Sequence, residues 1–151
     1  MLRWRPSTDS EAGSASLEFI TTGMILLLPL VYLTLTMSEL QAGSLAVEGA
    51  ARQAVRLFVQ SESVEAATAR SERAVDFALA DHGLPPGSAT VAVSCTPRPA
   101  ECLQRGSLVT VAVATTVALP LVPPVLDLDV ALSIPVRSVA TERVSRFWGA
   151  G

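Results

Sequence analysis

Twenty consecutive residues without a formal charge, Phe19 to Ser38, constrain this 151-residue chain more than any other feature. Tyr32 is the only ionisable side chain among them. Because a helix rises about 1.5 Å per residue, a run of about 20 apolar residues can cross the hydrocarbon core of a bilayer. The sequence therefore predicts a transmembrane helix over residues 14–38.

The residues on either side of this run predict its orientation. Arg3 and Arg5 precede it, whereas Glu39 and Glu48 follow it before any arginine. Positively charged flanks tend to remain in the cytoplasm. We therefore expect a single-pass protein of the cell membrane, with a cytoplasmic N-terminus and an extracytoplasmic C-terminal region.

Residues 39–82 have the period of two helices. Apolar residues recur at spacings of four, three, one and three, which indicates one buried stripe, and Glu48 can pair with Arg52 on the outer face. Ser63 is the expected N-cap of a second helix that ends near His82, with Gly83 as its left-handed cap. The expected buried positions are Val47, Ala51, Ala54, Val55 and Phe58 in the first helix, and Val64, Ala67, Val75, Ala78 and Leu79 in the second.

Residues 83–151 alternate instead with period two. This alternation predicts an antiparallel sheet with one buried face. Pro135 cannot donate to a ladder, so the third strand is expected to lie at an edge or to be interrupted there. The predicted inward rows are Val91, Val93 and Cys95; Val109, Val111, Val113, Val117 and Leu119; and Leu128, Val130, Leu132, Ile134 and Val136.

These patterns together predict an α+β fold. An N-terminal transmembrane helix continues into an amphipathic helix, and a second helix and a small three-stranded antiparallel sheet follow. The expected organisation is a leader peptide at 1–13, a transmembrane helix at 14–38, an extracytoplasmic helical region at 39–82 and a small β-sheet domain at 83–151.

Cys95 and Cys102 flank a short loop that contains Pro97 and Pro99. Outside the cytosol, two nearby cysteines favour a disulfide, and the prolines favour the turn that closes it. We expect a disulfide between Cys95 and Cys102. Two buried free thiols in a reducing compartment remain the alternative.

Other function classes lack the residues that they need. The net charge is −3, and the eleven basic residues, all arginine, form no patch dense enough for nucleic acid. His82 is the only histidine and nothing marks a partner serine, so we expect no enzyme. One histidine and one cysteine pair predict no metal site, and the scattered glycines predict no phosphate-cradling loop and no cofactor.

The N-terminal junction resembles that of a known family. Residues 13–19 read GSASLEF, with the glutamate five positions after the glycine, and they run straight into the apolar segment. Residues 47–52 read VEGAAR, an alanine-rich segment with one glutamate and one arginine. On these two motifs, the chain resembles the TadE-like minor pseudopilins of tight-adherence (Flp-type) pilus systems. The resemblance is close over residues 10–60 and extends to the remainder only in outline.

The resemblance implies proteolytic processing. A prepilin peptidase would cut between Gly13 and Ser14, which leaves 138 of the 151 residues with Glu18 as the fifth. The Glu18 carboxylate would then lie one helical turn from the new ammonium and pair with it or with that of a neighbouring subunit. The implied partners are the peptidase, other pilin or pseudopilin subunits, inner-membrane assembly proteins and the membrane. Related major pilins often carry a bulky apolar residue after the cut, so Ser14 favours a minor role.

Two other interpretations stay open. One is a permanently anchored single-pass protein with an extracytoplasmic binding domain. The other is a secreted domain released after Ala46, although the apolar run exceeds the usual ~7–15 residues of a signal peptide. The three interpretations differ in the mature N-terminus, which is Ser14, the original start or Val47.

Overall fold

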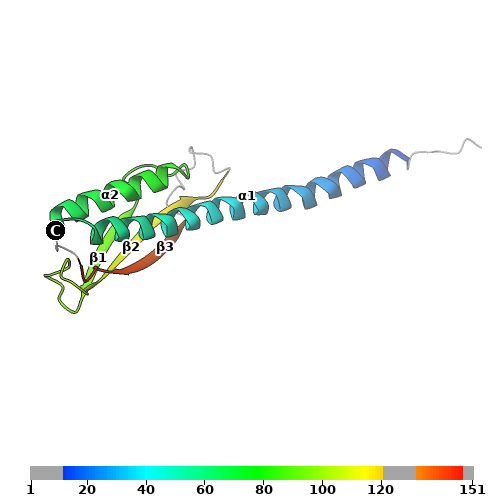
Figure 1. Cartoon of the computed structure of the whole chain (residues 1–151). Helices are drawn as coiled ribbons and strands as arrows, with labels where there is room; N and C mark the ends of the chain where they lie inside the picture. Colours follow the sequence, from blue (N-terminus) through cyan, green and yellow to red (C-terminus); the bar gives the residue numbers. More distant parts are fainter. Residues whose placement is uncertain (1–11, 121–131, 148–151) are drawn as a thin grey trace, which may run out of the picture. The chain divides into compact units, whose positions relative to one another are not determined.

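The computed structural model describes residues 12–120 and 132–147, with side chains from Ser14 onward (Figure 1). The chain divides into two compact units, residues 1–36 and 37–151. The predicted α+β fold is confirmed: a long apolar N-terminal helix and a second helix precede a three-stranded antiparallel sheet. The elements are α1 (Ala12–Val59), α2 (Val64–Ala80), β1 (Thr90–Thr96), β2 (Leu108–Ala118) and β3 (Ser133–Arg143).

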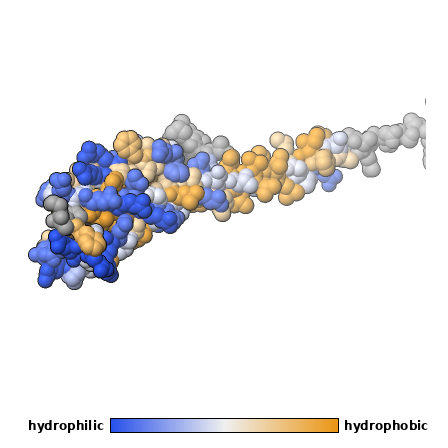
Figure 2. Space-filling model, in the orientation of Figure 1, coloured by the Kyte–Doolittle hydropathy of each residue, from blue (hydrophilic) through white to orange (hydrophobic). Residues whose placement is uncertain are grey.

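The first unit contributes the N-terminal part of α1. Every residue from Ser14 to Leu35 is exposed, and most of them are apolar, as the largely orange surface in Figure 2 shows. The Thr34 hydroxyl donates to the Val31 carbonyl at 2.8 Å, and the Thr36 hydroxyl donates to the Tyr32 carbonyl at 2.8 Å. Polar groups that bond within their own helix avoid the cost of an unsatisfied donor in lipid. Helix α1 is long and apolar enough to span a membrane.

The second unit packs the rest of α1 and helix α2 on one face of the sheet. β2 is the central strand, with β1 and β3 antiparallel on either side. Its inward valines are fully buried beneath the apolar stripe of α1, which is confirmed as predicted. The core residues of these two elements are Ala46, Val47, Ala50, Ala51, Ala54, Val55, Phe58 and Val59 in α1, and Val109, Val111 and Val113 in β2.

Helix α2 begins at its predicted cap. The Ser63 side chain accepts a hydrogen bond from the Ala66 amide at 3.2 Å, and Gly83 has a positive φ of 76° just beyond the helix. Ser71 is buried and donates from Oγ to the Ala54 carbonyl at 3.1 Å, which ties α2 to α1. Among the buried positions predicted for α2, Ala67, Val75 and Leu79 are buried and Ala78 is half-buried.

The prediction of a buried Val64 was wrong. Val64 is 40% exposed because it is the first residue of α2 and lies over an open hollow beside Leu103 and Gln104.

β3 extends further than its apolar pattern predicted. It runs to Arg143, and its inward positions Ser138 and Glu142 pair with Val113 and Val109 of β2. Because these inward residues are polar, the second half of the strand lacks the alternation of apolar and polar side chains on which the prediction relied. Pro135 lies in an edge strand, as predicted. The expected positions Leu128 and Val130 lie outside the described residues.

A close approach of α1 to the sheet at Gly43 gives the first testable prediction. A Cβ at Gly43 would collide with Cγ2 of Val117, whereas a Cβ at Gly49 would meet nothing within 4 Å. We expect Gly43→Ala to lower the free energy of unfolding by about 1–3 kcal/mol through overpacking. Gly49→Ala, the matched control, should raise it by up to about 1 kcal/mol through helix propensity.

The measurement is denaturant unfolding of the full chain in detergent, followed by circular dichroism. Equal stabilities for the two variants would contradict this packing of α1 against β2.

Candidate functional site

The predicted processing junction lies at the start of α1. Gly13 and Ser14 fall within the first turn of the helix, and residues 1–11 of the expected leader lie outside the described residues. Glu18 follows Ser14 by four positions, which places the two about 6 Å apart along the axis and on one face. The structure therefore places Ser14 and Glu18 together on one exposed helical surface.

Glu18 is the only charged residue from Ser14 to Ser38. Its side chain is exposed, and no residue of the described chain forms an ion pair or hydrogen bond with it. A carboxylate on a surface of this kind is costly in lipid without a partner. None of the described residues supplies a cation that could neutralise it within an apolar environment.

The two cysteines lie at disulfide distance, with their Cα atoms 5.2 Å apart. Cys95 ends the inward row of β1, and Cys102 lies in the loop between β1 and β2; both are buried. Arg98, between them, donates to Glu101 at 3.2 Å and to Gln104 at 2.8 Å. These two bonds hold the Arg98 side chain against residues of its own loop.

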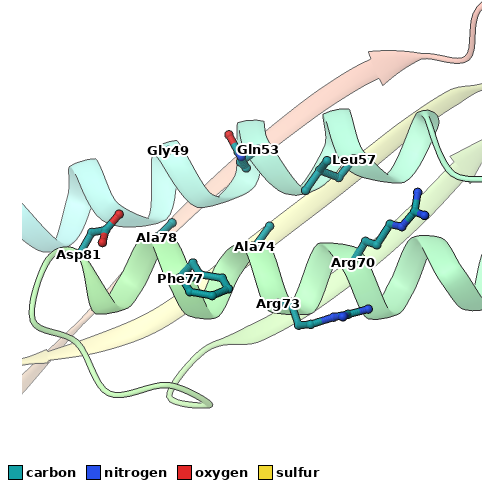
Figure 3. A pocket seen from close by; sticks show the side chains of 9 residues that line it. All are labelled: Gly49, Gln53, Leu57, Arg70, Arg73, Ala74, Phe77, Ala78 and Asp81. Atoms are coloured by element: carbon teal, nitrogen blue, oxygen red, sulfur yellow. The ribbon is translucent and has the colours of Figure 1, made fainter.

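An open groove of about 610 Å³ lies between α1 and α2 (Figure 3). Gly49 lies beside Ala78 and Asp81 at one end, and Leu57 lies beside Arg70 at the other. No nucleophile with a nearby base lies among the lining residues. The residues that line the groove are Gly49, Gln53, Leu57, Arg70, Arg73, Ala74, Phe77, Ala78 and Asp81.

The alanine-rich segment of residues 47–52 has a buried side and an exposed side. Val47, Ala50 and Ala51 of this segment are buried against the sheet, while Glu48 and Arg52 form the predicted ion pair on the outer face. The alanines are thus explained by packing. The charged pair is exposed and contributes little to stability on its own.

Neither a metal centre nor a catalytic cluster occurs among the residues that the structure describes. No group of three or more metal-ligating side chains forms there, and His82 is exposed after the end of α2. Every buried polar side-chain atom in the same residues has a hydrogen-bond partner.

No protein family, curated protein or solved structure matches this chain. The functional argument consequently rests on its own residues. Sequence reasoning correctly predicted that Cys95 and Cys102 lie together, and the roles of Gly13, Ser14 and Glu18 stay predictions, but it missed the groove. The sequence signal for the groove is the helical spacing of Arg70, Ala74, Phe77 and Asp81. This spacing has a meaning only once the face of α2 that packs on α1 is known.

The cysteine pair gives a second testable prediction. The double variant Cys95→Ala/Cys102→Ala should lose about 2–3 kcal/mol of unfolding free energy, because a closed loop of this length restricts the unfolded chain. Denaturant unfolding of the full chain with and without a reductant measures the effect.

The reductant should destabilise the parent chain and leave the double variant unchanged. A parent chain that is indifferent to reductant would show that the two thiols are free.

Proposed function

We propose that this chain is a structural, TadE-like minor pseudopilin of a tight-adherence (Flp-type) pilus or a related secretion apparatus. One observation carries the proposal: an exposed apolar helix bears a single carboxylate, Glu18, one turn after a Gly13–Ser14 junction. A permanent anchor could also hold such a carboxylate at the headgroup level of the membrane. In a subunit that is cut and then assembled through its helix, the same carboxylate would in addition gain a partner, the new ammonium.

Cleavage would change the chemistry of this surface. Hydrolysis of the Gly13–Ser14 peptide bond consumes one water and leaves a carboxylate on the leader and an ammonium on Ser14. Glu18 then has a cation one turn away, or the ammonium of an adjacent subunit. In an apolar helix bundle, an unpaired charge costs several kcal/mol, so only the stagger that pairs the two groups is favourable.

The same proposal assigns the partners and the location. Before assembly, the chain is a single-pass membrane protein with its N-terminus in the cytoplasm and residues 39–151 outside. A prepilin peptidase processes it, and inner-membrane assembly proteins pass it to other pilin or pseudopilin subunits. The small domain of residues 37–151 would then sit on an assembled helix.

Processing is tested by the N-terminus of the membrane-extracted chain. We expect intact mass and N-terminal sequencing to show a start at Ser14 only in cells that contain the prepilin peptidase. Gly13→Leu should leave the chain uncut, because a side chain at this position blocks access to the bond. Gly23→Leu is the matched control, since a Cβ at Gly23 meets nothing within 4 Å, and it should be cut normally.

A chain that keeps its original start beside an active peptidase would overturn the proposal and leave a permanently anchored protein. A start at Val47 would instead identify a secreted domain.

Glu18 is tested separately from processing. Glu18→Gln should still be cut at Ser14, yet its amount in the assembled, sheared fraction should fall at least about tenfold. Removing one member of a buried ion pair costs about 3–5 kcal/mol, which is more than this reduction requires. Glu39→Gln, at the opposite end of the uncharged run, is the matched control and should assemble normally. Equal assembly of the two variants would remove the role assigned to Glu18.

A further inference from the structure

The groove between α1 and α2 has a shape that suits the binding of a third helix. Its floor is made of small residues, Gly49, Ala74 and Ala78, and Phe77 stands on its α2 wall (Figure 3). Phe77 is 74% exposed, although the other aromatic residue of the second unit's helices, Phe58, is buried. A large aromatic side chain left outside a well-formed core beside a hollow indicates a surface that another molecule covers.

Gly49 has no role in the packing of its own chain. It lies within α1, its φ is not in the left-handed region, and a Cβ there would meet nothing within 4 Å. Glycine in a helix costs about 1 kcal/mol relative to alanine. Gly43 pays the same penalty to approach Val117, whereas Gly49 only deepens an open groove. Its missing side chain therefore makes room for something outside the chain.

The charges at the groove define the direction of an occupant. Arg70 and Arg73 lie toward the end at Leu57, and Asp81 lies at the other end. No ion pair satisfies these three side chains among the described residues. An occupant with a carboxylate near the two arginines would complement them.

The outer face of α1 carries a ridge that matches this groove. We define the ridge as Gln41, Leu45 and Glu48, whose spacings of four and three place them on one side of the helix. Leu45 is 61% exposed, and the Glu48 side chain is 46% exposed. On the ridge, the Glu48 carboxylate follows Leu45 by one helical turn. In the groove, Arg70 and Arg73 likewise lie about one turn beyond the apolar part, so the ridge and the groove are complementary.

We propose that the groove of one copy receives the ridge of a second copy, with the two α1 helices running in the same direction. The inference rests on the proposed function, because copies assembled through the same N-terminal segment enter an assembly with parallel α1 helices. Leu45 then packs against Ala74 and Phe77. Because α2 runs antiparallel to α1, Glu48 comes level with Arg70 and Arg73.

Arg52, the partner of Glu48 within one chain, also meets opposite charges in this contact. Arg52, one turn beyond Glu48, comes level with the start of α2, where Glu62 and Glu65 are exposed. Glu48 exchanges its pair with Arg52 for the arginines of the neighbour, which costs little because exposed ion pairs are weak. Since groove and ridge are different surfaces, the contact is head-to-tail and adds copies without closing on itself.

Engineered disulfides test this contact in the full chain. Leu45→Cys and Gln53→Cys, combined in one chain, place thiols on ridge and groove two turns apart on α1, about 12 Å along its axis. A disulfide needs Cα atoms within about 7 Å, so any bond between these positions must join two copies. Because Cys95 and Cys102 already lie at disulfide distance, the added thiols are the free ones.

Oxidation in cells that contain the native assembly system should give the double variant a ladder of dimers, trimers and larger species. Neither single variant should form a ladder. Leu45→Cys with Val139→Cys is the matched control, because Val139 is exposed on the sheet face opposite the helices, and it should form none. Adding Gly49→Leu to the double variant should abolish the ladder by filling the groove.

The N-terminus of the same samples separates the two proposals. Chains that start at Ser14 but form no ladder would overturn the groove contact and leave the pseudopilin function standing. Dimers from Leu45→Cys alone would show a two-fold contact, and a link from Gln53→Cys to another protein would show a different occupant; either overturns the inference. A ladder from uncut chains would keep the contact and remove the pilin-type processing.

Discussion

The packing of small side chains on α1 against the valines of β2 is the interaction on which the second unit depends. Ala50, Ala51 and Ala54 are fully buried, as are Val111 and Val113 opposite them. Short side chains let the helix lie close to the sheet, and Phe58 supplies the one large aromatic contact in this core. A chain with so few aromatic residues obtains its dense interior from close approach rather than from side-chain bulk.

Because only the C-terminal part of α1 packs on the sheet, the surface of the helix has two different parts. The N-terminal part has no cover at all, and its apolar side chains and single carboxylate suit it to a membrane or a helix bundle. The C-terminal part buries one stripe on the sheet and leaves Leu45, Glu48 and Gly49 outside. One helix thus combines the element proposed to anchor and assemble the subunit with half of the groove proposed to bind its neighbour.

Much of the fold could be predicted because it depends on local patterns. The capping serine at 63, the positive φ at Gly83 and the alternating valines of β2 follow from chemistry within a few residues of each position. The length of β3 could not, since Ser138 and Glu142 occupy inward positions that only pairing with β2 reveals. The groove was invisible for the same reason: its two walls are 13 or more residues apart in sequence, and exposed Phe77 resembles a core residue until the packing of α2 is known.

The cysteine pair makes the second unit sensitive to the redox conditions under which it folds. Cys95 and Cys102 are buried together only when β1 and the following loop have folded, and a reducing cytosol would keep their sulfurs as thiols. Once the chain is denatured, free thiols react with an alkylating agent and a disulfide does not, so alkylation after denaturation tells the two states of this loop apart. In a mixed population, the oxidation state of this one small loop distinguishes molecules that have met an oxidising compartment from those that have not.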